Sequence, residues 1–315
     1  LRERAAAARA ASRALARLSS SARNAALERI ATLLETQQDV VLAANALDLQ
    51  AAREAGLDDY FIERLTLTPE RLRGIAADTR TVMRLEDPVG EVFDSRTLPN
   101  GLLIGRRRVP LGVIACIYES RPNVTVDAAA LTLKSGNAVL LRGGKEAAST
   151  NALLVEIMRR ALADADLPED AVCLVPPGDR EEIRELVSLT EIVDLAIPRG
   201  GEGLIRFVAE VARVPVIKHY KGVCHLFLDE SAELDMARSL TLNSKVQRPG
   251  VCNALECLLV HQRSAERLLP ELGRALIAEG VELRACERAR ALVAGARAAA
   301  ESDFGAEFLD KVLAI

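Results

Sequence analysis

Residues 113–147, VIACIYESRPNVTVDAAALTLKSGNAVLLRGGKEA, decide the fold of this chain. The apolar runs Val113–Tyr118 and Ala138–Leu141 are typical of buried strands, and the pattern over 124–135 between them is helical. This order predicts a βαβ unit, whose two strands are parallel. The alternation continues, with further strands expected at Val172–Val175 and Ile192–Ile197 and helices near 146–164, 180–188 and 202–212. The sequence therefore predicts an α/β domain built on a parallel sheet.

A second α/β set follows. It comprises expected strands at 223–228, 255–260 and 281–285 and helices at 231–246, 263–279 and through the late 290s. Glycine and proline interrupt the pattern near Pro215–Gly222, which is therefore the expected domain boundary. A length of 315 residues also favours two domains over one.

The residues before the sheet are mainly helical. Thr68-Pro69-Glu70 supplies a cap, a first-turn proline and an acidic first turn for a helix through about Met83. Leu98-Pro99-Asn100-Gly101 separates two strand-like runs, Val92–Thr97 and Leu102–Val109, and predicts a β-hairpin. The run Arg106-Arg107-Arg108 favours a solvated strand edge over an anion site.

Composition excludes several classes of protein. A net charge of −4 with 27% charged residues lacks the basic excess of a nucleic-acid binder. Apolar segments such as Val109–Tyr118 are shorter than the roughly 20 residues that span a bilayer, and no basic-then-apolar leader opens the chain, so we expect a cytoplasmic protein. The six cysteines have no zinc-site spacing, so we expect no metal. Four of them lie in apolar runs and are expected to be buried, reduced thiols: Cys116, Cys173, Cys224 and Cys257.

Polar loops follow three of the predicted strands, where ligands bind in parallel sheets. Asn123 follows the first strand and is either a helix cap or an oxyanion donor, and its position alone favours the cap. Arg142-Gly143-Gly144-Lys145-Glu146 and Arg199-Gly200-Gly201 each combine glycines with a helix start. Each loop alone is equally compatible with a plain turn. Together they favour a phosphate-bearing ligand.

Cys252 is the candidate nucleophile, in the stretch QRPGVCNALECLLVH over 247–261. Pro249 and Gly250 place it in an irregular segment, and the cations Arg248 and Lys245 could favour its thiolate. Composition alone leaves open whether it is catalytic or one more small hydrophobe. A Cys–His hydrolase would also need a base; two of the three histidines, His225 and His261, are better explained as structural, and His219 is undecided.

Four stretches together resemble the γ-glutamyl phosphate reductases, the proline-biosynthesis branch of the aldehyde dehydrogenase superfamily. They are residues 117–147 of the opening stretch, IPRGG (197–201), GVCHLFLDE (222–230) and NSKVQRPGVCNALECLLVH (243–261), and the resemblance extends over nearly the whole chain. It implies a Rossmann-type NADP-binding domain over 1–217, with a helical N-terminus and the 92–109 hairpin as an oligomerisation element. Residues 306–315 would return to that domain, and 218–305 would form a smaller α/β catalytic domain.

The resemblance also implies a reaction: reduction of L-glutamyl 5-phosphate by NADPH to L-glutamate 5-semialdehyde and phosphate. Cys252 would form a thioester, while the Asn123 side chain and the Cys252 N–H would stabilise the oxyanion. The adenosine ribose would lie against Arg142, Gly143, Gly144 and Lys145. The two cations among these residues suit a 2′-phosphate, so NADPH is favoured over NADH. Arg199, Gly200 and Gly201 would lie over the pyrophosphate and nicotinamide, and Glu307 would bind the nicotinamide ribose.

One difference supports the reductase. Hydrolytic aldehyde dehydrogenases carry a Glu-Leu-Gly-Gly-Lys motif whose glutamate activates water, and the matching segment here is Lys218-His219-Tyr220-Lys221-Gly222, without a carboxylate. A thioester intermediate would thus be protected from hydrolysis. Lys218, Lys221 and Arg248 are candidates for attracting the anionic substrate, or are solvated surface charges.

The sequence departs from the family at both ends, since it begins at Leu1 and stops at Ile315, where family members continue. We therefore expect a chain that is C-terminally short relative to the family. The full-length protein would be a homo-oligomer and could couple to glutamate 5-kinase. Two alternatives remain: another aldehyde dehydrogenase-type oxidoreductase, and a non-catalytic truncated fragment that binds nucleotide or a partner chain.

Overall fold

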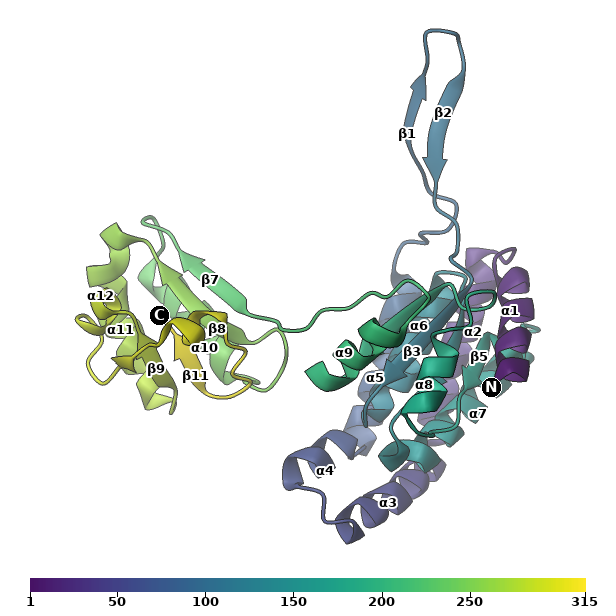
Figure 1. Cartoon of the computed structure of the whole chain (residues 1–315), viewed down its shortest axis with the longest axis horizontal. Helices are drawn as coiled ribbons and strands as arrows, with labels where there is room; N and C mark the ends of the chain where they lie inside the picture. The colour runs from purple at the N-terminus through teal and green to yellow at the C-terminus, as the bar shows by residue number, and fades with distance from the viewer. The chain divides into compact units, whose positions relative to one another are not determined.

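The chain forms two compact units, unit 1 over Leu1–Lys218 and unit 2 over His219–Ile315 (Figure 1). The computed structural model describes the backbone of residues 1–315 and every side chain apart from that of Tyr60. The boundary falls inside the predicted interruption at 215–222. Each unit has a hydrophobic core of its own.

The core of unit 1 surrounds a four-stranded parallel sheet with the order β5-β4-β3-β6. Its strands are β3 (Val113–Tyr118), β4 (Ala138–Arg142), β5 (Val172–Leu174) and β6 (Leu195–Arg199). Every residue of β3 is buried, as its continuous apolar run predicts. The chain adds β4 and β5 on one side of β3 and β6 on the other. The strand order therefore reverses between β3 and β6, where parallel sheets bind ligands at the carboxyl ends of the strands.

Helices cover this sheet and form the N-terminal part of unit 1. They are α1 (Arg2–Leu15), α2 (Ser20–Thr36), α3 (Gln38–Glu54), α4 (Asp59–Leu65), α5 (Pro69–Arg84), α6 (Pro122–Lys134), α7 (Ala148–Asp164), α8 (Arg180–Leu186) and α9 (Glu202–Val211), with 3-10 turns η1 (Lys145–Ala147) and η2 (Glu169–Ala171). Helix α5 begins as predicted, because the Arg71 N–H donates to the Thr68 hydroxyl. Strand β6 begins three residues later than predicted, since Ile192 and Val193 donate to the Leu189 carbonyl in a turn.

The predicted hairpin forms from β1 (Val92–Thr97) and β2 (Leu103–Arg107), which pair antiparallel. Its turn places the positive φ on Gly101 (85°), whose N–H donates to the Leu98 carbonyl at 2.8 Å. This is a three-residue loop ending in a left-handed glycine. Arg108 pairs with Glu91 at 2.6 Å and is half exposed, which agrees with a solvated edge.

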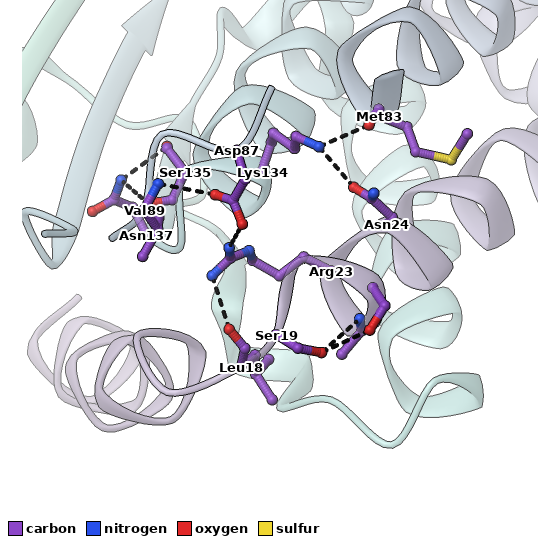
Figure 2. Close-up of polar contacts among 12 residues, drawn as sticks. Leu18, Ser19, Arg23, Asn24, Met83, Asp87, Val89, Lys134, Ser135 and Asn137 are labelled. Atoms are coloured by element: carbon purple, nitrogen blue, oxygen red, sulfur yellow. Dashed lines mark hydrogen bonds and ion pairs between the residues drawn. The ribbon is translucent and has the colours of Figure 1, made fainter. Parts of the chain in front are cut away.

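A buried polar network holds the segment between α5 and the hairpin against the body of unit 1 (Figure 2). Arg23 of α2 is 2% exposed and forms an ion pair with Asp87, whose other oxygen accepts the Val89 N–H at 2.9 Å. The Lys134 ammonium of α6 donates to the Met83 carbonyl at 2.7 Å. The base of the hairpin is thus attached to two helices.

Unit 2 is a five-stranded parallel sheet with the order β10-β9-β11-β8-β7. Its strands are β7 (Cys224–Leu228), β8 (Leu255–Val260), β9 (Glu282–Ala285), β10 (Arg297–Ala298) and β11 (Val312–Ala314). Its helices are α10 (Leu234–Val246), α11 (Gln262–Ala278) and α12 (Glu287–Arg290), followed by the 3-10 turn η3 (Glu301–Gly305).

Two expectations for unit 2 are wrong. Residues 306–315 do not return to the first domain: β11 lies between β9 and β8, with Ala314 opposite Cys257. The helix expected through the late 290s ends at Arg290, and turns over 291–295, with Gly295 at a φ of 89°, lead from it to β10. The apolar residues of β11 complete the core of unit 2 instead. Among the described residues, no helix is long and apolar enough to cross a membrane.

Candidate functional site

Three loops meet at the amino-terminal edge of the unit 2 sheet. Residues 219–223 lead into β7, 247–254 into β8 and 306–311 into β11, and in a parallel sheet such entry segments share one edge. A Cβ added to Gly222 would lie 2.6 Å from the Cys252 carbonyl oxygen and 3.3 Å from Glu307 Oε1. The fold therefore brings Cys252 and Glu307 together, on the edge opposite to the one that the carboxyl-end rule indicates.

The Cys252 turn, residues Val251–Ala254, presents its thiol to solvent. The Ala254 N–H donates to the Val251 carbonyl at 3.0 Å, and Cys252 is exposed. Its own N–H has no acceptor among the residues that the structure describes. Its carbonyl lies 3.6 Å from the Cys224 sulfur. An exposed thiol beside an uncommitted amide suits an acyl acceptor with an oxyanion donor.

The other thiols differ from Cys252 in their surroundings. Burial raises the pKa of Cys116 to about 12 and that of Cys173 to about 11, and it also raises the pKa of Cys257. These three thiols are unreactive near neutral pH. Cys224 is half-buried, so the expectation that it is buried is wrong. Cys286 is the second exposed thiol and precedes α12.

Of the two cations expected to favour the Cys252 thiolate, only one is exposed. Lys245 is fully buried and pairs with Glu256 at 2.8 Å, so it contributes no exposed positive charge to the turn. Arg248 is exposed. His261 caps α11 by accepting the Arg263 N–H at 3.3 Å, in agreement with a structural role. Glu256 was not predicted as a functional residue from the sequence, because its partner is known only from the fold.

In unit 1 the ends of β3, β4 and β6 align. Tyr118 lies opposite Arg199 and Ile117 opposite Arg142 in the strand register. The loops that follow these strands therefore meet at the carboxyl edge, on either side of the strand-order reversal. This edge contains all the residues predicted to bind cofactor in unit 1.

Asn123 is exposed and lies one residue inside α6, whose cap position is Arg121. Its side chain does not cap the helix. Instead Asn123 Nδ2 donates to Asp127 Oδ2 at 3.0 Å, which orients the amide and leaves a second N–H for a ligand. Burial raises the pKa of Asp127, and the hydrogen bond from Asn123 opposes that rise. Asp127 was missed from the sequence, although its i,i+4 spacing from Asn123 was visible.

The loop 142–145 does not offer the helix terminus that the sequence indicated. Asp48 of α3 accepts the Ser149 N–H at 3.1 Å and the Thr150 N–H at 2.8 Å at the start of α7. A buried carboxylate from the same chain therefore occupies that anion position. Gly143 is required for packing, since a Cβ there would lie 2.3 Å from Asn151 Nδ2.

The two cations of this loop are not equivalent. Arg142 is half-buried and donates to the Gly178 carbonyl at 2.6 Å. Burial lowers its pKa, and the carboxylates of Glu182, Glu146 and Asp179 oppose that shift. Lys145 is exposed and pairs with no described residue. Lys145 is therefore the cation more available to a phosphate.

The loop after β6 is held by Glu119. Its carboxylate accepts the Gly201 N–H at 2.9 Å, and a Cβ on Gly200 would lie 2.7 Å from Glu119 Cδ. These glycines permit close approach to an acidic group, in the same way that they would to a pyrophosphate. The strand-order reversal, the two glycine loops and Lys145 together fit a dinucleotide at this edge of unit 1.

Among the described side chains, no group of three or more His, Cys, Asp or Glu could hold a metal ion. A cavity of about 330 Å³ lies elsewhere in unit 1 and shares no residue with the candidate site; its lining residues are Arg4, Val155, Arg159, Asp170, Cys173 and Leu174.

Known proteins share both the sequence and the fold. Residues 1–282 match the aldehyde dehydrogenase family. The γ-glutamyl phosphate reductase of Xanthomonas campestris pv. campestris (strain B100) is 55% identical over 98% of this chain and 74% of its own length. That of Sorangium cellulosum (strain So ce56) is 56% identical, over 98% of this chain and 73% of its own.

The crystal structure of γ-glutamyl phosphate reductase from Thermotoga maritima gives a TM-score of 0.91 at 43% identity, over 99% of this chain and 76% of that one. This agreement confirms the predicted fold class, including a length shorter than that of the relatives. The chain therefore belongs to the aldehyde dehydrogenase family, within its γ-glutamyl phosphate reductase branch.

Proposed function

We propose that this chain reduces L-glutamyl 5-phosphate to L-glutamate 5-semialdehyde and phosphate with NADPH, through a thioester at Cys252, in proline biosynthesis. The observation that carries the proposal is the Cys252 turn. It presents an exposed thiol beside a free amide, next to Glu307, in a chain 55% identical to a γ-glutamyl phosphate reductase.

In the proposed reaction the Cys252 thiolate adds to the acyl carbon, the carbon–oxygen bond to phosphate breaks, and phosphate leaves with the electron pair. NADPH, when bound, supplies the hydride that reduces the thioester. The Cys252 sulfur then leaves as thiolate when the reduced adduct collapses to the aldehyde. An oxyanion forms in each half-reaction, and the Cys252 N–H is one donor to it. Asn123 is the second donor, by resemblance to the family.

For the cofactor we assign the loops of unit 1. Arg142, Gly143, Gly144 and Lys145 lie by the adenosine ribose, and the exposed Lys145 ammonium supports a 2′-phosphate and hence NADPH. A second set, Arg199, Gly200 and Gly201, lies along the pyrophosphate and nicotinamide. Glu307 of unit 2 binds the nicotinamide ribose, and its place beside the Cys252 turn supports that role.

The absence of a carboxylate from residues 218–222 supports a reductase over a hydrolytic relative. Gly222 closes that segment and lies against the Cys252 carbonyl. A base at this place would activate water beside the thioester and divert it to the acid. We also propose that the protein works in the cytoplasm, which agrees with its six free cysteines, as a homo-oligomer that could couple to glutamate 5-kinase.

The test is the reverse reaction, with glutamate semialdehyde, phosphate and NADP. We expect NADPH to form only when phosphate is present, and Cys252→Ala to abolish it, whereas Cys286→Ala, the matched exposed thiol, retains it. Phosphate-independent oxidation would favour another aldehyde dehydrogenase-type oxidoreductase. Absence of turnover with any acceptor would favour a non-catalytic binding fragment, and full activity in Cys252→Ala would refute the thioester.

A further inference from the structure

A buried ion pair closes the base of the loop that contains Cys252. Lys245 lies in the last turn of α10 and Glu256 is the second residue of β8, so the two residues bracket the loop from both ends. The Lys245 Nζ lies 2.8 Å from Glu256 Oε2, and their side chains are 0% and 1% exposed. The pair therefore fixes where the loop leaves the helix and where it enters the strand.

The second oxygen of Glu256 holds another functional segment. Glu256 Oε1 accepts the Leu309 N–H at 3.1 Å. Leu309 has a φ of 53°, a conformation that a residue with a branched side chain adopts only when its surroundings enforce it. Leu309 lies two residues beyond Glu307 in the Glu307 segment, residues 306–311, which leads into β11, the neighbour of β8 (Figure 1).

Burial of this pair is not explained by stability. Moving two charges out of water is unfavourable, and proteins with well-packed apolar side chains in place of a buried pair are often as stable or more so. A carboxylate that uses one oxygen for an ammonium and the other for a main-chain amide is, however, a directional three-way connection. Apolar side chains could not replace the bond to Leu309.

We propose that Lys245 and Glu256 are positioning residues that couple the Cys252 turn to the Glu307 segment. This second proposal rests on the proposed function. The pair sets the position of the Cys252 thiol relative to the Glu307 carboxylate, which binds the nicotinamide ribose. Neither residue touches substrate or cofactor. The pair acts through the main chain on both sides.

Two double variants isolate the bond to Leu309. The amide variant is Lys245→Met/Glu256→Gln, and the apolar variant is Lys245→Met/Glu256→Met. Both remove the buried charges and roughly keep the volume. Only the amide variant offers an oxygen to the Leu309 N–H, and it also buries an NH2 group, whose cost is seen in the stability measurement. Urea unfolding of both variants checks that the fold is retained. Should the apolar variant not fold, Lys245→Met/Glu256→Leu takes its place with a shorter apolar side chain.

Kinetics provide the first measurement. We expect the amide variant to stay within about threefold of the wild type, and the apolar variant to show KM for NADPH about tenfold higher, as loss of one positioned hydrogen bond allows. A purely structural pair would change stability without separating the two variants in KM. Equal KM values in the two folded variants would overturn the proposal.

The second measurement needs no turnover, so it separates failure of this proposal from failure of the proposed function. Hydrogen exchange of the peptide that contains Leu309 should speed up about tenfold or more in the apolar variant and stay slow in the amide variant, because only the amide variant keeps an acceptor for that N–H. In a Cys286→Ser background, the rate at which iodoacetamide alkylates Cys252 should also differ between the two variants. If exchange at Leu309 and alkylation of Cys252 are the same in both, the coupling does not exist, whatever reaction the protein catalyses.

Discussion

At the scale of single residues, the two proposed oxyanion donors are fixed in different ways. The Cys252 N–H is a main-chain group in a turn, whereas the Asn123 amide depends on the Asp127 carboxylate for its orientation. A side-chain donor can be removed by substitution without changing the backbone. Asn123 is therefore the donor that mutation can test.

We predict that Asn123→Ala lowers kcat about 10²–10³-fold, the usual effect of losing one oxyanion donor, with little change in NADP affinity. Stopped-flow rates measure turnover, and a titration that follows the fluorescence of NADPH measures the affinity for the cofactor. Unchanged turnover would remove Asn123 from the mechanism.

Asp127 should make stability depend on pH in a particular direction. Burial raises its pKa in the folded protein above the ordinary 3.8, so the folded state binds the proton more tightly than the unfolded state does. The free energy of unfolding therefore falls as pH rises from 3.8 through the folded pKa, and the carboxylate is destabilising above it. Asp127→Asn removes this charge and keeps an oxygen for Asn123.

We therefore predict that Asp127→Asn is more stable than the wild type at neutral pH, and that the difference shrinks toward about pH 4. Urea unfolding across this range gives both curves. A difference that does not vary with pH would show that the carboxylate is not disfavoured in the fold.

At the scale of elements, the Cys252 turn depends on the segment that leads into β7, the strand beside β8. Gly222→Ala would place a methyl group 2.6 Å from the Cys252 carbonyl oxygen, so the turn must shift. We predict that kcat falls about tenfold or more, since small displacements of reacting groups have large effects. Gly305→Ala is the matched control, because a Cβ there meets no atom within 4 Å. Equal activity of the two variants would mean that the turn tolerates displacement.

The loop after β4 determines the choice of cofactor in the proposal. We predict that Lys145→Ala reduces the ratio of kcat/KM for NADPH to that for NADH about tenfold, the loss of one charge-assisted hydrogen bond. Arg13→Ala, which removes an exposed cation from α1, should leave the ratio unchanged. Steady-state rates with both cofactors provide the comparison. An unchanged ratio in Lys145→Ala would place the 2′-phosphate elsewhere.

The elements also show which features the sequence could predict. Strands β3 and β4, the hairpin and the start of α5 follow from local patterns and were correct. Asp48 at the start of α7 and Glu256 beneath the Cys252 turn depend on partners that only the fold identifies. Ile192 and Val193 look like strand residues, yet they lie in a turn that buries Val193 and leaves Ile192 partly buried. A hydrophobic period of two or 3.6 residues predicts a strand or a helix. It does not predict which side chain from a distant element will form a hydrogen bond or an ion pair with it.

At the scale of the whole molecule, the division into units was predictable and the path of the last strand was not. Glycine and proline near 215–222 mark a break in the pattern. Nothing in the three residues of β11 shows which sheet they join, since three apolar residues satisfy either core.

The attachment of the hairpin depends on the buried network of Figure 2. Arg23→Met would leave Asp87 partly buried without its partner, and we predict a loss of about 3 kcal/mol in the free energy of unfolding at neutral pH. The control is Arg2→Met, because the Arg2–Glu185 pair is exposed and its loss should cost less than about 1 kcal/mol. Urea unfolding measures both. Equal losses would contradict an anchoring role for Arg23.

The position of β11 between β8 and β9 has a consequence during translation. All four strands of the unit 1 sheet described above have been synthesised once residue 199 has left the ribosome, so they can pair while synthesis continues. The unit 2 sheet must wait for Ala314, which follows Val260 by 54 residues, about 3–10 s at typical rates of translation. During this interval the nascent chain carries an unpaired β8 edge, the kind of surface that chaperones shield.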